Sequence, residues 1–101
     1  MTHFQFYRSG ALFGIRYRFE AGESLPAHVH DATSVHNTIV LKGSCDFVEE
    51  GRTVRLSAGE VFDFDGTVRH RIVANEPCEI LNLFLNGEPE GYDTLPAEGV
   101  M

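Results

Sequence analysis

Lysine and long apolar stretches are nearly absent from this sequence, and each absence excludes a class of partner. Lys42 is the only lysine, and the 101 residues carry a formal net charge of −7 at pH 7. Nucleic acids and anionic membrane surfaces need clustered lysine and arginine, so we expect neither as a partner. No stretch reaches the roughly 20 apolar residues of a membrane span, and the first ten residues lack the apolar run of a signal peptide.

Cysteine is also scarce. Cys45 and Cys78 stand far apart and form no CxxC pattern, so a disulfide framework is not expected. A buried free cysteine usually serves as a small core hydrophobe, and we interpret both residues in that way. Together with the missing signal peptide, this indicates a soluble protein in a reducing, cytoplasmic setting.

Helical periodicity is missing throughout, whereas short strand patterns separated by turn residues fill the chain. Apolar residues make up 43% of the sequence, which suits one packed domain spanning residues 1–101. Strands with turns every eight to twelve residues are typical of a sandwich or barrel. The core is expected over about residues 12–85, and residues 86–101, rich in Gly, Pro and acid, form a surface tail. The expected strands are 12–19, 38–41, 45–48, 53–56, 61–64, 68–74 and 79–85.

Four of the five histidines occur at a spacing that suits a metal site. His28 and His30 are two residues apart, so in a strand both side chains leave the same face, about 6.6 Å apart along the chain. Neutral imidazole is the commonest protein ligand for first-row transition metals. We therefore predict a metal site formed by His28, His30, His36 and His70 within a small β-barrel. His3, near the N-terminus, is expected to be a surface residue.

Glycines frame these histidines in two segments. The first segment contains Gly22, His28, His30 and Gly43, and the second contains Gly59 and His70. This pattern resembles the cupin superfamily, the RmlC-like jelly-roll proteins, and the resemblance covers about residues 12–85. It implies an all-β fold, a double-stranded β-helix or jelly-roll barrel. It also implies pairing as a homodimer, which is common among small cupins.

The sequence departs from the family pattern at several positions. His36 stands where the family has a glutamate ligand, six residues before Gly43. Asp65 and Thr67 replace a proline and a glycine of the second motif, and Asn75 comes one residue late. A dication with four neutral ligands stays doubly positive, which favours anionic or enolate-like ligands and acidifies a bound water more strongly. The alternative for His36 is a position outside the ligand set, which would leave a three-histidine site.

The function that this resemblance favours is a metal-dependent oxygenase acting on a small chelating organic substrate. One divalent transition metal is expected per chain, with iron or manganese favoured and nickel, zinc, cobalt or copper open, because imidazole suits all of them. Two alternatives remain: a metal-bearing module that binds or senses a small molecule without turnover, and a lyase or isomerase using the ion as a Lewis acid. Fold alone does not choose among them.

Strand alternation makes further predictions about individual side chains. Arg69 and Arg71 flank His70 and are expected to point away from it, and Arg16 and Arg18 are expected on the outside of the barrel, paired with carboxylates. Asp63 and Asp65 lie near the metal strand, either as proton acceptors or as turn residues. The aromatic residues expected to fill the barrel or line its pocket are Phe13, Tyr17, Phe47, Phe62, Phe64 and Phe84.

Overall fold

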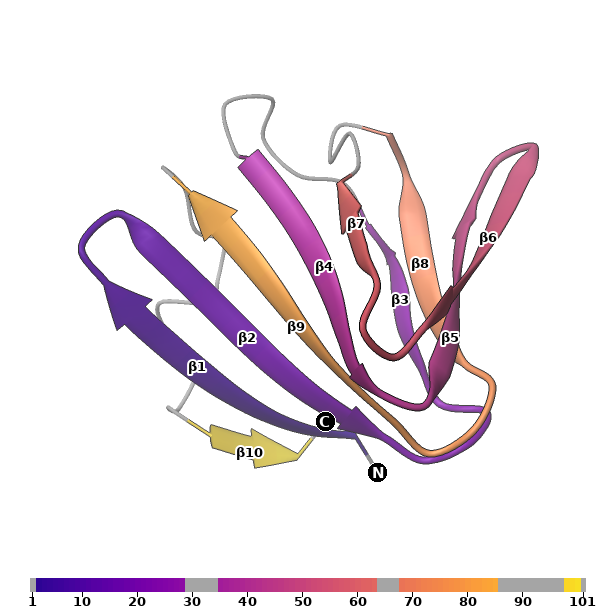
Figure 1. The fold of residues 1–101 in the computed structure, drawn as a ribbon, viewed down its shortest axis with the longest axis horizontal. Helices are drawn as coiled ribbons and strands as arrows, with labels where there is room; N and C mark the ends of the chain where they lie inside the picture. The colour runs from indigo at the N-terminus through magenta and orange to yellow at the C-terminus, as the bar shows by residue number, and fades with distance from the viewer. Residues whose placement is uncertain (1, 29–34, 64–67, 86–97, 101) are drawn as a thin grey trace.

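The chain folds into two antiparallel β-sheets that face each other (Figure 1). The computed structural model describes residues 2–28, 35–63, 68–85 and 98–100. The large sheet has the strand order β10-β1-β2-β9-β4-β7, and the small sheet has the order β3-β8-β5-β6. The predicted all-β jelly-roll class is confirmed, and no residue of the described ranges is helical. The strands are β1 (His3–Ser9), β2 (Leu12–Phe19), β3 (Ser24–His28), β4 (Val35–Lys42), β5 (Ser44–Glu49), β6 (Arg52–Ser57), β7 (Val61–Asp63), β8 (His70–Ala74), β9 (Cys78–Leu85) and β10 (Glu98–Val100).

Period-two alternation explains how these strands build one core between the sheets. Along β2, Phe13, Ile15, Tyr17 and Phe19 are buried, while Arg18 between them is exposed. The same alternation on the other strands brings fifteen buried hydrophobic residues into one cluster. Of the predicted barrel aromatics, Phe13, Tyr17, Phe47 and Phe84 are buried and Phe62 packs against the cluster at its margin; Phe64 lies outside the described residues.

The N-terminal strand was not among the expected strands. β1 pairs with β2 along its whole length, and Phe4 reaches the core at 7% exposure. Residues 98–100 of the predicted surface tail form β10, which pairs with β1, so that part of the tail belongs to the large sheet. The alternation of Phe4 and Phe6 with Gln5 and Tyr7 was the available signal for β1. His3 is exposed, as predicted.

The strand directions give the barrel two distinct ends (Figure 1). At one end β3 and β7 finish and β4 and β8 begin, and we call this the histidine end. At the opposite end the chain turns from β4 into β5 and from β8 into β9, and we call this the closed end. Gly43, in the first of these turns, has φ of +74°, and a Cβ there would lie 3.1 Å from Cys78 Cα and closer still to the Pro77 carbonyl oxygen. Only glycine lets the two turns approach this closely.

Among the described residues, no helix is long and apolar enough to cross a membrane.

Candidate metal centre

His70 is the predicted ligand whose side chain the structure describes most fully. It is the first residue of β8 and only 2% exposed. Its Nδ1 lies 2.7 Å from the carbonyl oxygen of Val68. A carbonyl oxygen can only accept, so Nδ1 carries the hydrogen and Nε2 carries the lone pair of the neutral ring. A neutral ring in this tautomer would bind a metal through Nε2.

Phe47 fixes the plane of the His70 ring. The two rings stack with centroids 5.2 Å apart and an interplanar angle of 17°. Phe47 is fully buried on β5 and also contacts Phe62 of β7, at 4.9 Å between centroids. The backbone bond and the stacked ring together hold the imidazole in one orientation.

His28 lies beside His70 in the small sheet. The two residues are register partners between β3 and β8, and the register of β3 shifts between Leu25 and His28. Such irregularities re-aim side chains and are frequent next to functional sites. In the large sheet, His36 is a register partner of Phe84, near the beginning of β4. Both backbone positions therefore lie at the histidine end.

Three of the four predicted ligands lack a described side chain. The side chains of His28 and His36 fall outside the described set, and His30 falls outside the described residues altogether. Within the described side chains, no three histidine, cysteine, aspartate or glutamate residues gather into a group that could hold a metal ion. The structure therefore brings the backbones of His28 and His70 together, and four-histidine ligation stays a prediction.

Glu49 is a residue near the candidate site that the sequence analysis missed. It is the register partner of His70 across β5 and β8. Its carboxylate is ion-paired with Arg52, whose guanidinium lies 5.7 Å from the centre of the Phe62 ring. The signal was present in the alternation of Cys45, Phe47 and Glu49, since the first two are buried.

The other predicted polar residues of this region that the structure describes, Asp63, Arg69 and Arg71, lie on the outside of the barrel. Asp63 is exposed opposite Asn37, which places its carboxylate away from the interior, and Asp65 lies outside the described residues. Arg69 and Arg71 are exposed as predicted. A strand was expected to begin at Val68, but β8 begins at His70, and Val68 precedes it and is 41% exposed. A hollow of about 280 Å³ lies beside His70. It is lined by Val48, Glu49, Glu50, Arg69, His70 and Arg71.

A second polar position lies inside the barrel between β4 and β9. The Thr38 hydroxyl donates to Asn82 Oδ1 at 2.7 Å, and the two residues are 0% and 5% exposed. Thr38 follows His36 by two residues, and Asn82 precedes Phe84 by two. A buried hydrogen bond of this kind satisfies both groups without solvent, so the interior next to the histidine end is not uniformly apolar.

The two cysteines occupy the closed end, far from the predicted ligands. Both are free thiols, Cys45 at 0% exposure and Cys78 at 3%, which confirms the prediction of small buried residues without a disulfide. The hydrogen bond between the two side chains and the burial of Cys45 raise the pKa of the Cys45 thiol. The pair therefore keeps one proton to high pH.

Comparisons with known proteins agree with this fold. The family model described as a cupin domain matches residues 15–84. KdgF from Halomonas sp. has a similar structure, with a TM-score of 0.78 and 24% identity over 93% of this chain and 85% of that one. An RmlC-like cupin protein from Desulfovibrio desulfuricans gives a TM-score of 0.75 and 24% identity over 82% and 80% of the two chains.

A third similar structure is the cupin domain of an XRE family transcriptional regulator from Enterobacter cloacae. Its TM-score is 0.68, with 15% identity over 77% of this chain and 84% of that one. No curated protein matches the sequence. Structural likeness at these identities shows the fold, whereas the match of the family model spans more than half of the chain. The chain belongs to the cupin domain family.

Proposed function

We propose that the protein is a metal-dependent enzyme, an oxygenase acting on a small chelating organic substrate, and that His28, His30, His36 and His70 hold its divalent metal. The observation that carries the proposal is the state of His70. A buried imidazole whose Nδ1 is held by a backbone carbonyl has the tautomer and orientation of a metal ligand. His28 lies directly beside it as its register partner.

The surroundings of His70 fit a transition metal that binds through nitrogen. All four predicted ligands are imidazoles, which suit iron or manganese as well as nickel, zinc, cobalt or copper. When bound, the ion supplies the chelation of substrate and the redox chemistry with dioxygen. We favour iron or manganese because both support that chemistry.

The protein's own side chains orient the ligands and exclude water. The Val68 carbonyl and the Phe47 ring hold His70, and Phe62 backs Phe47. Phe84, opposite His36 in register, packs 5.8 Å from Phe13 between ring centres. These aromatic rings give the histidine end an apolar lining, in which the charge of a bound substrate interacts more strongly than in water. The Thr38–Asn82 pair adds a polar position within the barrel.

Oxygen consumption tests the proposal. Protein reconstituted with Fe²⁺ or Mn²⁺ is incubated with a panel of catechols, enolisable diketones and thiols in an oxygen-electrode cell. We expect substrate-dependent O₂ uptake that is lost in His70→Ala and retained in His3→Ala, because His3 is an exposed residue of β1. Uptake that survives in His70→Ala would contradict the proposal.

A second candidate is a binding or sensing module without turnover. It is favoured by the similar fold of the cupin domain in a transcriptional regulator. A binding module would show a rise in Tm with ligand and no product. Conversion of substrate without O₂ consumption would instead indicate Lewis-acid lyase or isomerase chemistry.

A further inference from the structure

The hollow beside His70 contains two arginines that have no carboxylate partner. Arg69 and Arg71 flank His70 in the sequence, and all three residues line the hollow of about 280 Å³. Both arginines are exposed, and neither forms an ion pair within the part of the chain that the structure describes. A guanidinium is always charged and offers five N–H donors. The hollow therefore presents two cations that a bound anion could pair with.

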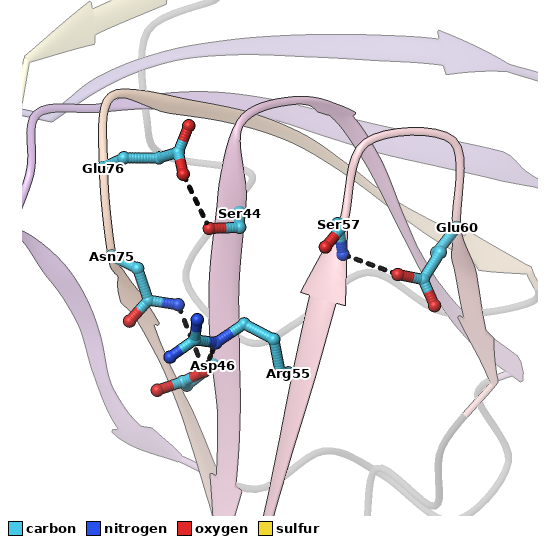
Figure 2. A network of polar contacts seen from close by, with 7 residues as sticks. All are labelled: Ser44, Asp46, Arg55, Ser57, Glu60, Asn75 and Glu76. Atoms are coloured by element: carbon cyan, nitrogen blue, oxygen red, sulfur yellow. Dashed lines mark hydrogen bonds and ion pairs between the residues drawn. The ribbon is translucent and has the colours of Figure 1, made fainter.

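Along the outer face of the small sheet, the charges nearer the closed end are paired (Figure 2). Asp46 accepts hydrogen bonds from Arg55 at 2.7 Å and from Asn75 at 3.1 Å. Val48 follows Asp46 by two residues and so lies on the same face of β5. Arg71 is the register partner of Val48, yet no carboxylate pairs with it among the described residues. Charge pairing along this face thus ends at the hollow.

Two glutamates also line the hollow, but they do not cancel its arginines. Glu49 is ion-paired with Arg52, which neutralises its charge. Glu50, in the turn after β5, then remains against Arg69 and Arg71. Two positive charges against one leave the hollow with a net charge of +1, on a chain whose net charge is −7. A positive concave site raises the local concentration of anions.

The hollow adjoins the candidate metal centre, because His70 belongs to both. Glu49, the register partner of His70, lines it from β5. Sites for small organic ligands have volumes of about 300–1,000 Å³, so a hollow of about 280 Å³ suits one small molecule or part of one. A substrate held at His70 would therefore have a positively charged space next to it.

The chemistry of the hollow favours a carboxylate. Arginine binds carboxylates through two parallel, charge-assisted hydrogen bonds. A carboxylate carries one negative charge, which matches the net charge of the hollow, whereas a phosphate monoester carries about −1.5 to −2 at pH 7. We propose that the substrate bears a carboxylate group and that Arg69 and Arg71 bind this group in the hollow. The inference rests on the proposed function, because it takes His70 as a ligand of the metal that the same substrate chelates.

Two catechols that differ in one group test the inference. 3,4-Dihydroxybenzoate carries a carboxylate, and 3,4-dihydroxybenzamide carries a neutral amide of nearly the same size. Isothermal titration calorimetry without oxygen measures the Kd of each for the protein reconstituted with Mn²⁺ and for the metal-free protein. We expect the wild type to bind the carboxylate about 10-fold more tightly than the amide in both states, because the charge-assisted bonds form with the carboxylate alone.

Replacing the two arginines should remove this preference. In the double variant Arg69→Gln with Arg71→Gln, the ratio of the two Kd values should fall to about 1, and each single variant should lose part of it. The matched control is Arg18→Gln, which removes the same charge at an exposed position of β2 that has no carboxylate partner within the described residues. It should keep the preference. Circular dichroism and thermal melting confirm that each variant is folded.

Equal Kd values for the two catechols in the wild type overturn the inference. So does a preference that survives in the double variant, or one that Arg18→Gln lowers as much, because net charge alone would then explain it. Failure of the proposed function looks different. A preference for the carboxylate that depends on the two arginines, in a protein that takes up no O₂, would support the subsite and contradict the oxygenase. O₂ uptake without the preference would do the reverse.

Discussion

The two ends of the barrel both bury groups that carry chemistry, but they satisfy these groups differently. At the closed end, Cys45 and Cys78 are hydrogen-bonded to each other under a turn in which Gly43 packs against Pro77. At the histidine end, His70 is held from behind by the Val68 carbonyl and the Phe47 ring. The cysteines are partners of one another, whereas the histidine is oriented by a backbone carbonyl at its Nδ1 and by a stacked aromatic ring.

This difference separates a structural role from the metal-binding role that we propose. A thiol pair that is 0% and 3% exposed contributes packing. An imidazole with a fixed tautomer, beside a second histidine at a bulged strand, is arranged as metal ligands are arranged. Perturbing the closed end should therefore change stability, and perturbing the histidine end should change metal binding.

The largest effect is expected at Gly43. Gly43→Ala combines a positive φ with a contact to the Pro77 backbone, so we expect a loss of about 3–4 kcal/mol in the free energy of unfolding. Gly51→Ala is the matched control, because Gly51 has φ of +75° but no neighbour within 4 Å of its added Cβ. It should lose only about 1 kcal/mol. Urea denaturation measures both, and equal losses would contradict the packing argument.

At the histidine end, metal removal should be the dominant perturbation. Metal that binds only the folded protein stabilises it by about 2.7 kcal/mol when its free concentration is 100 times Kd. A chelator should therefore lower the Tm of the wild type and leave that of His70→Ala unchanged. His3→Ala should respond as the wild type does, and an equal response in His70→Ala would place the metal elsewhere.

The cysteine pair predicts a pH dependence in the alkaline range. The pKa of Cys45 is raised by its hydrogen bond with Cys78 and by burial, so the folded pair keeps a proton that the unfolded chain has released. Above about pH 8.5 the unfolded state binds fewer protons, and the free energy of unfolding falls by about 1.4 kcal/mol per pH unit. Replacing both Cys45 and Cys78 by alanine should remove this slope, whereas burial would still raise the pKa of Cys78 if Cys45 alone were replaced. Urea denaturation at several pH values measures the slope.

The smallest effect is expected on the outer face of the small sheet. The hydrogen bond from Arg55, and then that from Asn75, lower the pKa of Asp46. A lowered carboxyl pKa stabilises the fold above the unfolded value near 4, and this stabilisation is lost as the pH falls through the folded value. Because Arg55 is largely exposed, Asp46→Asn should cost only about 0.5–1 kcal/mol at pH 7. The free energies of unfolding of Asp46→Asn and the wild type should converge below pH 2, and a difference that persists there would contradict this account.

Much of the fold follows from local signals in the sequence. The alternation from Leu12 to Phe19 predicts β2, and the turn residues around Gly51 predict the hairpin between β5 and β6. Local signals could not predict β10, because its three residues form a strand only by pairing with β1, which lies far away in the sequence. The predicted strand 68–74 started two residues too early, because β8 begins at His70.

The candidate site was predictable only in part. Spacing singled out His70, which is buried at the beginning of β8, and its role as a ligand stays a prediction. Sequence could not show that the Val68 carbonyl and Phe47 fix its ring, since these contacts depend on backbone geometry and on packing between strands. Alternation with Cys45 and Phe47 could have placed Glu49 on their face of the strand, but its proximity to His70 comes from the register between β5 and β8.

Metal content measured by elemental analysis tests the central claim most directly. The protein is purified without an affinity tag, reconstituted with Fe²⁺ or Mn²⁺ and desalted, alongside His70→Ala, His36→Ala and His3→Ala. The account predicts about one equivalent of metal in the wild type and in His3→Ala, and a loss in His70→Ala and His36→Ala. Full retention in His36→Ala alone would reduce the site to three histidines. No metal in the wild type after reconstitution, or full retention in His70→Ala, would contradict the account.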